Sequence, residues 1–536
     1  MDSDIPFRVE IPGWDVRAGA CSSFQIEPSA LTAAVDHIAA ERSREDRGED
    51  EPDEDRSAEA LRTRGALPRA RAAATRSAAA SLPVPSRYRP RAPEGTAARA
   101  TRGMRGPARD PLVPAIGKWA IVVLERDAAA ANDALAPLLA RRREQGVAYE
   151  GHAKAGGKPG ILVMPRPTSE NPERWKEYVE RAAGGTPPHH LLFVGGPDRF
   201  PFEAQARLDR ERCTGRLDVG DSPGGPLSWE ACRRYAEKVV AFESGALPVE
   251  PRALMYAFGK DRATWQSHDE LAVPLRRALE SGELIGPNVP WSKPDVLFAD
   301  DATVEKLAGR LATTRPALVF TASHGLERVP DRELWGALTD VRYAGAAGDA
   351  VLSAAQIAQG AFGCGAVVLA FACFSAGVPR RSAMAFLEDK VDLDLSPEPF
   401  VPALPRALLA HEKGPVAFVG HVDRTTSLSF AWGREGPAAF RDFCEWSLGG
   451  FGTLGQAMRS LRESAAAASL DLADALSPVP GGGSRGTEQQ ILKHWIRYHD
   501  MRRYLLLGDP AIRVRDGLPK SGDTQIAVNR PARAQP

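Results

Sequence analysis

The chain has 536 residues, which is too long for a single hydrophobic core and predicts two or three domains. Hydrophobic residues make up 43% and charged residues 26%, as in an ordinary soluble globular protein. The 69 basic and 69 acidic side chains cancel, so no net charge favours nucleic acid or a membrane as partner.

Targeting and metal-binding signals are absent from the sequence. The N-terminus lacks a basic start followed by an apolar run, and no apolar stretch approaches the ~18 residues that span a bilayer. The six cysteines form no CxxC pair, and HExxH does not occur, so neither a metal nor another cofactor is predicted. We therefore expect a cytoplasmic protein with reduced thiols.

The N-terminal fifth of the chain divides into two parts. Residues 1–42 contain a short apolar stretch and most of a helix predicted at 28–44, and we interpret them as a pro-segment or interaction segment. Residues 43–112 are first acidic and then rich in Arg, Ala and Pro, with few bulky aliphatic residues. Such a segment cannot bury enough surface to order itself, so it is predicted to be a disordered linker. A basic tract at 62–109 leaves contact with nucleic acid as an alternative.

From residue 113 onward, strands alternate with helices, which is typical of a mostly parallel α/β sheet covered by helices on both faces. In a first α/β subdomain at 113–250, strands are predicted at 118–125, 160–165, 189–196 and 215–220, and helices at 131–146, 173–185 and 228–245. In a second at 251–516, strands are predicted at 252–259, 295–299, 316–325, 365–373 and 414–422, and helices at 270–282, 303–312, 353–360, 403–414 and 493–504. Residues 517–536 form a C-terminal tail.

The most informative residues are His324 and Cys373, each at the carboxyl end of an apolar strand. At that edge of a parallel sheet the loops meet and ligands bind. If the two strands are neighbours, both side chains emerge at the same edge. Cys373 follows His324 by 49 residues, close to the ~50 that separate the His and Cys of caspases.

This pair suits nucleophilic catalysis. An imidazole can take the proton of a thiol, whose ordinary pKa is about 8.5, and then protonate the leaving amine. Gly325 permits a close backbone approach, so its N–H and that of Cys373 are candidates for an oxyanion hole. A Cys closing an apolar strand is often only a core residue, which is the alternative for each residue taken alone.

The segments FTASHG, VVLAFACFSAG, GPVAFVGHVDR and LLLGDPAIRV together resemble the gingipain-type peptidases, cysteine peptidases of the caspase fold. The resemblance covers roughly residues 118–516. It implies a caspase-like catalytic domain at 251–516, with His324 as general base and acid, Cys373 as nucleophile, and the N–H groups of Gly325 and Cys373 as oxyanion hole. The family can carry an acid near the His, after the strand at 252–259. Here Gly259 and Lys260 follow that strand, with Asp261 next, so the orienting group stays open and a backbone carbonyl is an alternative.

Substrate specificity has two candidate carboxylates. Asp269 lies where the resembled enzymes place an acid that selects Arg or Lys at P1, and Asp423 follows the next core strand. Each is also an ordinary helix cap or surface charge. Arg380 and Arg381, after the nucleophile, keep an acidic P1 residue open.

Two other side chains compete for the catalytic roles. His421 also leaves a strand at the carboxyl edge and is a rival base. Cys364 precedes its strand and is expected at the opposite edge.

The predicted function is a cysteine endopeptidase that cuts a protein partner, or its own linker, at one or a few sites. The resemblance implies a role in bacterial defence or cell death, such as antiviral activation of a pore-forming protein. The alternative is an inactive caspase-like scaffold that recruits partners through residues 1–110. Substrate, activating trigger and oligomeric state are not encoded in any motif.

Overall fold

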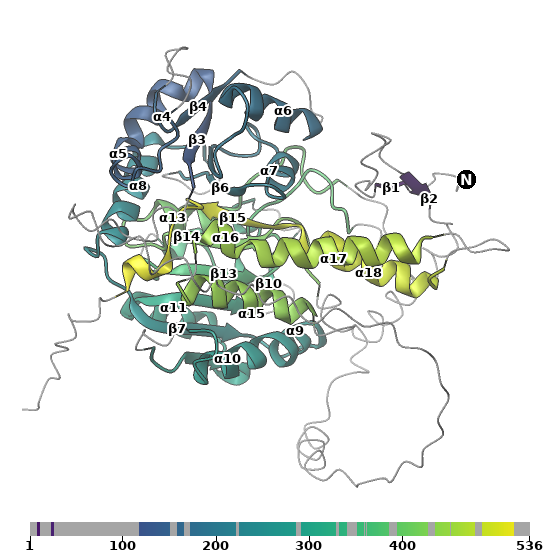
Figure 1. The fold of residues 1–536 in the computed structure, drawn as a ribbon. Coiled ribbons are helices and arrows are strands. Elements are labelled where there is room, and N and C mark those ends of the chain that lie inside the picture. Colours follow the sequence, from purple (N-terminus) through teal and green to yellow (C-terminus); the bar gives the residue numbers. More distant parts are fainter. Residues whose placement is uncertain are drawn as a thin grey trace, which may run out of the picture. The chain divides into compact units, whose positions relative to one another are not determined.

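The computed structural model describes residues 8–10, 23–25, 117–150, 158–165, 172–220, 225–285, 291–327, 332–339, 351–357, 360, 362–384, 394–426, 435–450, 452–477 and 485–518 (Figure 1). The predicted helix at 28–44, the linker at 43–112 and all but the first two residues of the tail lie outside these residues. Near the N-terminus, the short strands β1 (Arg8–Glu10) and β2 (Ser23–Gln25) pair antiparallel. No described helix is both long and apolar enough to cross a bilayer.

The core of the fold is one sheet of ten strands, in the order β4-β3-β5-β6-β15-β14-β13-β9-β7-β8. Their bounds are β3 (Trp119–Leu124), β4 (Ile161–Met164), β5 (His190–Val194), β6 (Cys213–Leu217), β7 (Glu250–Ala257), β8 (Asp295–Phe298), β9 (Pro316–Ala322), β13 (Val367–Phe371), β14 (Ala417–His421) and β15 (Tyr504–Gly508). The prediction of an α/β protein with a mostly parallel sheet is thus confirmed. Strands of both predicted subdomains belong to this one sheet.

The sheet consists of two parallel halves that run in opposite directions. Strands β14 and β15 pair antiparallel, and every other neighbouring pair in the sheet is parallel. Strand β15 comes from the end of the chain but lies between β6 and β14. As a consequence, the amino ends of β5 and β6 lie at the same sheet edge as the carboxyl ends of β9 and β13.

Helices connect the strands as the sequence pattern indicates. Those of the first half are α4 (Ala128–Ala134), α5 (Ala136–Glu144), α6 (Pro172–Ala183), α7 (Phe202–Leu208) and α8 (Trp229–Glu243). Those of the second half are α9 (Arg262–Ser267), α10 (Val273–Glu280), α11 (Val304–Thr313), α12 (Ala354–Ile357), α13 (Ala403–Ala410), α15 (Glu435–Leu448), α16 (Leu454–Ala457), α17 (Arg459–Ala475) and α18 (Glu488–Met501). A π-helical turn at His268–Ala272 joins α9 to α10. The sequence pattern did not predict the helices α7, α9, α15, α16 and α17.

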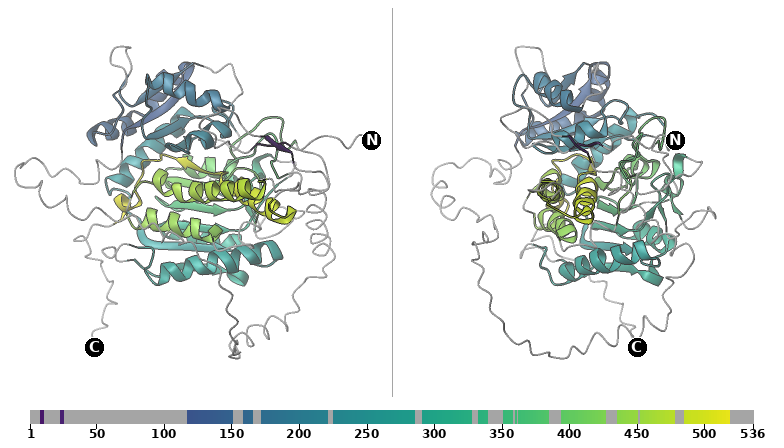
Figure 2. Two further views of the ribbon diagram at one scale, coloured as in Figure 1. Left: turned by 45° about the vertical axis from the view of Figure 1, so that its right-hand side comes forward. Right: turned by 90° about the vertical axis from the view of Figure 1, so that its right-hand side faces the viewer.

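Helices cover both faces of the second half. Strand β13 alternates, so Val368 and Phe371 point to opposite faces. Val368 lines a small cavity together with Leu311 of α11 and Leu408 of α13. Phe371 contacts Phe440 of α15, with ring centroids 6.2 Å apart. Figure 2 shows α15, α17 and α18 together on this second face.

Three two-residue strands form a small antiparallel sheet directly after β9. They are β10 (His324–Gly325), β11 (Leu338–Thr339) and β12 (Val351–Leu352). His324 pairs with Thr339 and Gly325 with Leu338. This sheet holds the backbone of His324 and Gly325 at the carboxyl edge of the large sheet.

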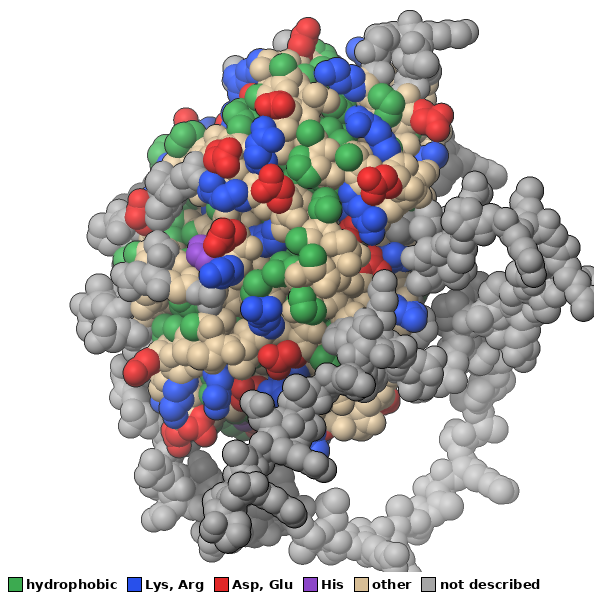
Figure 3. All heavy atoms as spheres, turned by 90° about the vertical axis from the view of Figure 1, so that its left-hand side faces the viewer, with side chains coloured by type: hydrophobic (Ala, Val, Ile, Leu, Met, Phe, Trp, Pro, Cys, Tyr) green, Lys and Arg blue, Asp and Glu red, His purple; other side chains and the backbone are tan. Residues whose placement is uncertain are grey.

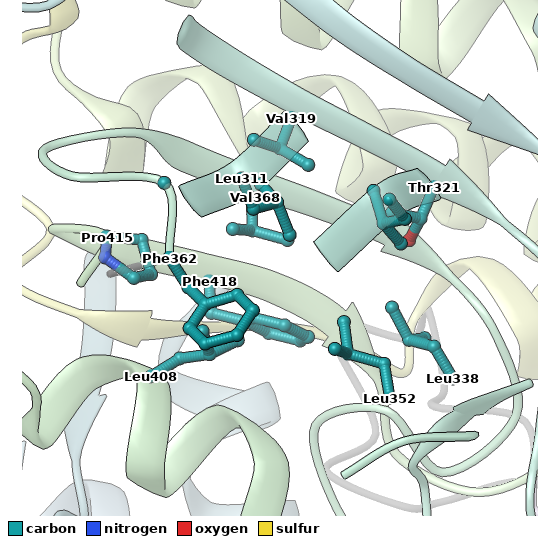
Figure 4. A pocket seen from close by; sticks show the side chains of 12 residues that line it. Leu311, Val319, Thr321, Leu338, Leu352, Phe362, Val368, Leu408, Pro415 and Phe418 are labelled. Carbon is teal, nitrogen blue, oxygen red and sulfur yellow. The ribbon is translucent and has the colours of Figure 1, made fainter. Parts of the chain in front are cut away.

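A cavity of about 20 Å³ lies on the first face, between β9, β13, β14 and the helices α11 and α13 (Figure 4). Its lining is apolar except for Thr321 of β9. Because a single water needs about 10–15 Å³, this space is too small for a substrate and is a packing gap. The hydroxyl of Thr321 is buried there without a hydrogen-bond partner among the described residues.

Replacing Thr321 with valine is therefore expected to stabilise the fold by about 1 kcal/mol. The change keeps the shape of the side chain and removes a buried polar atom that has lost its hydration. Thermal unfolding of the two proteins measures it, with Thr321→Ser as control, because serine keeps the hydroxyl and loses the methyl group. A valine variant less stable than the wild type would show that the hydroxyl has a partner.

Candidate active site

The structure places His324 and Cys373 at equivalent positions on adjacent strands. Strands β9 and β13 are parallel neighbours, and Ala322 pairs with Phe371. Each candidate follows its paired residue by two positions. The N–H of Ser323 still donates to the carbonyl of Phe371, at 3.1 Å. The strands are thus neighbours, as the predicted arrangement required, and both residues leave the sheet at its carboxyl edge.

The backbone of Gly325 lies directly against that of Cys373. A Cβ atom at position 325 would overlap the carbonyl oxygen of Cys373 and lie 3.0 Å from its nitrogen. Only glycine fits this approach without moving the nucleophile. The two N–H groups that the sequence proposed for an oxyanion hole therefore belong to backbone segments in contact.

The third member of the site is Asp261, which follows β7, the other neighbour of β9. Nε2 of His324 donates to Oδ2 of Asp261 at 2.6 Å. Both side chains are about one-fifth exposed. The orienting group that the sequence left open is therefore this carboxylate. Because it holds Nε2–H, the ring's Nδ1 carries the lone pair.

Asp261 is itself fixed by a helix terminus. Its side chain caps α9, where Oδ1 accepts from the N–H of Thr264 at 2.9 Å and the Thr264 hydroxyl bonds back to the N–H of Asp261. Burial alone would raise the pKa of Asp261. The hydrogen bond and charge of His324, together with the two donors of Thr264, outweigh it and lower that pKa to about 2. The carboxylate is therefore ionised at neutral pH. Its Oδ2 accepts from His324 and its Oδ1 from Thr264.

The thiol of Cys373 is protonated in this conformation. Cys373 is partly exposed, whereas its neighbours Ala372 and Phe374 are buried. Its Sγ–H donates to the carbonyl of Thr425 at 3.4 Å. Removal of water from around the sulfur and the carboxylate of Glu327 raise the pKa of the thiol to about 12, against the opposing charge of Arg424.

The backbone is strained immediately after Cys373. Phe374 has a φ of 55° and Asp423 a φ of 95°, in the left-handed region that favours glycine. The N–H of Phe374 donates to the carbonyl of Asp423 at 2.7 Å, so the two unusual residues hold each other. Phe374 also packs edge-on against Trp335 at 5.4 Å. Strain of this kind clusters at functional sites, where the surrounding structure maintains it.

Asp423, a predicted specificity residue, is fully buried close to Cys373. Its carboxylate accepts from the hydroxyl of Ser382, the N–H groups of Ala383 and Arg424, and the guanidinium of Arg503, at 2.6–2.8 Å. These four donors fill its acceptor positions. A basic substrate side chain could reach it only by displacing Arg503.

Asp269, the other predicted specificity residue, lies in the π-helical turn after α9. It is 43% exposed and bonds Nδ1 of His268 at 2.7 Å. This carboxylate is thus accessible, on the helical segment that begins at Asp261. Arg380 and Arg381 are both exposed, and Arg381 pairs with Asp394 at 2.8 Å.

A charged pair that the sequence did not indicate stands beside the thiol. Nε of Arg424 donates to Glu327 at 2.6 Å, joining the loop after His324 to the loop after β14. Glu327 raises the pKa of the Cys373 thiol, and Arg424 lowers it. In the sequence, only position pointed to this pair: Glu327 lies three residues after His324, and Arg424 directly follows Asp423.

The two rivals for the catalytic roles lie where they cannot serve. His421 is fully buried, and its two ring nitrogens bond the carbonyls of Asp423 and Asp500, each at 3.0 Å. Cys364 lies before β13, at the opposite end of the strand from Cys373.

A second histidine–cysteine cluster was missed by sequence reasoning. His189, His190 and Cys213 lie together at the amino ends of β5 and β6. Nε2 of His189 lies 3.4 Å from Sγ of Cys213. The sequence placed His189 and His190 at the start of a predicted strand, but the next predicted strand began at residue 215, so the pattern did not set Cys213 beside them.

Comparison with known proteins gives no family assignment. No protein-family model matches this sequence, and no curated protein matches it significantly.

Proposed function

We propose that the chain is a cysteine endopeptidase of the caspase–gingipain type, with Cys373 as nucleophile and His324 as general base and acid. The observation that supports this most is the row of three residues at one sheet edge. Asp261, His324 and Cys373 follow the consecutive strands β7, β9 and β13, and Asp261 bonds His324. A carboxylate that orients an imidazole beside a nucleophile is the arrangement of catalytic triads.

In this proposal each group has a defined step. Nδ1 of His324 takes the thiol proton, and the sulfur attacks the substrate carbonyl carbon. The N–H groups of Gly325 and Cys373 stabilise the oxyanion. The imidazolium then protonates the leaving amine, and water hydrolyses the thioester with His324 again as base. Asp261 holds the ring and stabilises its charged form throughout.

The resting conformation requires one change before the reaction. The thiol bonds the carbonyl of Thr425, so it must turn toward His324 to lose its proton. Substrate binding or an activating partner is the proposed cause. This favours limited cleavage of a specific protein, or of the chain's own linker, over general proteolysis. A place in bacterial defence rests on the resemblance alone.

The hydrogen bond from the thiol to Thr425 also favours one alternative. If the thiol never leaves Thr425, the domain is an inactive scaffold. Nucleic-acid binding has no support in the described residues on the face in Figure 3, where Lys and Arg side chains are interspersed with Asp and Glu. A broad single-sign patch is the usual footprint of such binding.

The test is cleavage of fluorogenic peptides with Arg, Lys or Asp at P1 by the full chain and by Cys373→Ala. We expect cleavage by the wild type and none by the variant. A preference for Arg or Lys that Asp269→Asn removes would support the exposed carboxylate as the P1 determinant. Labelling by a matching peptidyl chloromethyl ketone, mapped by mass spectrometry, should occur at Cys373. No cleavage and no labelling, with or without cell extract as a source of activator, would favour the scaffold.

A further inference from the structure

The cluster of His189, His190 and Cys213 lies outside the candidate active site and has the composition of a metal site. His190 and Cys213 are paired residues on the parallel strands β5 and β6. One ligand atom from each of the three residues lies within 4.8 Å of the others. They share the sheet edge of Cys373, but β15 and β14 lie between β6 and β13.

We propose that His189, His190 and Cys213 bind a Zn²⁺ ion. With Zn–S of about 2.3 Å and Zn–N of about 2.0–2.1 Å, tetrahedral geometry separates sulfur from nitrogen by about 3.6 Å. The observed separation of Cys213 Sγ from His189 Nε2 is 3.4 Å. The widest separation in the cluster, 4.8 Å at most, closes with side-chain shifts of about 1 Å. Water would complete the coordination.

A second observation supports the site independently of its spacing. His190 is completely buried, and its Nδ1 has no hydrogen-bond partner among the described residues. Its Nε2 bonds the hydroxyl of Thr453, at the start of α16, at 2.9 Å. Buried polar atoms are rarely left unpaired, and a metal-bound histidine usually bonds a second group through its other nitrogen.

Two of the three arginines near the cluster have acidic partners. Arg212, Arg459 and Arg462 lie near His189. Arg462 pairs with Asp209 at 2.9 Å, and Arg459 pairs with Glu463 at 2.8 Å. Zn²⁺ would displace the proton of Cys213, giving a thiolate ligand and one released proton.

A metal fits this cluster better than a second peptidase site does. Cys213 is only 5% exposed, so a peptide carbonyl cannot reach its sulfur. Zinc and a softer ion such as Cu⁺ can both use these ligands, and zinc follows from the mixture of imidazole and thiolate. Bound there, the ion would join β5 to β6 next to the start of α16.

The test uses the full-length protein, freed of metal and then incubated with Zn²⁺ and desalted. Elemental mass spectrometry should find about one zinc per chain in the wild type and in Cys364→Ser, which replaces another buried cysteine. It should find none in Cys213→Ser or His189→Ala. Because Cys373 and His324 are also possible ligands, Cys373→Ala is included and should retain the zinc.

Co²⁺ provides a readout that needs no variant. Coordination by Cys213 should give a near-ultraviolet thiolate-to-cobalt band in the wild type, and Zn²⁺ should abolish it. If circular dichroism shows that Cys213→Ser is unfolded, the test rests on the zinc content of His189→Ala, at a half-buried position, and on the cobalt spectrum of the wild type. Absence of zinc and of the cobalt band from the wild type would overturn the proposal. So would zinc that survives both cluster variants, or zinc that only Cys373→Ala removes.

Discussion

Replacing Asp261 with asparagine should lower kcat for peptide cleavage by about 10²- to 10⁴-fold and leave KM nearly unchanged. Asparagine fits the space but cannot stabilise the imidazolium of His324, and its amide can present a donor where the ring needs an acceptor. It remains a good helix N-cap, so α9 should stay intact. Steady-state kinetics with the best peptide of the P1 panel provides the measurement.

The matched control is Asp261→Ala, which removes both the acceptor for His324 and the cap of α9. Its kcat should fall as far as that of asparagine, but its melting temperature should fall further, since losing an N-cap costs about 1 kcal/mol. Equal melting temperatures with equal kcat losses would mean that the cap contributes little. An asparagine variant with full kcat would show that Asp261 does not position His324.

The same carboxylate makes a prediction about acid stability. The pKa of Asp261 in the fold is about 2, below its ordinary value of 3.8. A depressed carboxyl pKa stabilises the fold above the unfolded value, and this contribution is lost as the pH falls toward 2. The stability difference between wild type and Asp261→Asn should therefore be largest above pH ~4 and vanish near pH ~2.

Alkylation of Cys373 by iodoacetamide should be about 10³-fold slower at pH 7 than that of an ordinary free thiol. A thiol pKa of about 12 leaves only about 10⁻⁵ of the thiol as thiolate at that pH, against a few per cent for a pKa of about 8.5. The rate should rise about tenfold per pH unit up to pH ~10. Time-resolved peptide mapping by mass spectrometry follows this residue separately from the other cysteines.

Comparing iodoacetamide with an affinity label tests the proposed mechanism. A peptidyl chloromethyl ketone occupies the site, and the proposed turn of the thiol toward His324 then generates the thiolate. Labelling by it at pH 7 should be much faster than alkylation by iodoacetamide, and His324→Ala should abolish the difference. Fast alkylation by iodoacetamide at pH 7 would contradict the hydrogen bond to Thr425 as the resting state.

The sequence by itself determined the class of fold and the two central residues of the candidate site. Apolar runs of strand length alternating with helical periodicity fix a mostly parallel sheet, because each element must bury its apolar side. The placement of His324 and Cys373 at the ends of two such runs followed from the same pattern. Their adjacency followed from the preference of consecutive strands to be neighbours.

Only the tertiary structure decided which groups complete the site. Asp261 reaches His324 because β7 lies beside β9, and Asp423 is occupied by Arg503, 80 residues further along the chain. The insertion of β15 between β6 and β14 reverses half of the sheet, which brings His190 and Cys213 to the edge of Cys373. Strand order and direction depend on contacts between distant segments, and hydrophobic periodicity is a local property that does not record them.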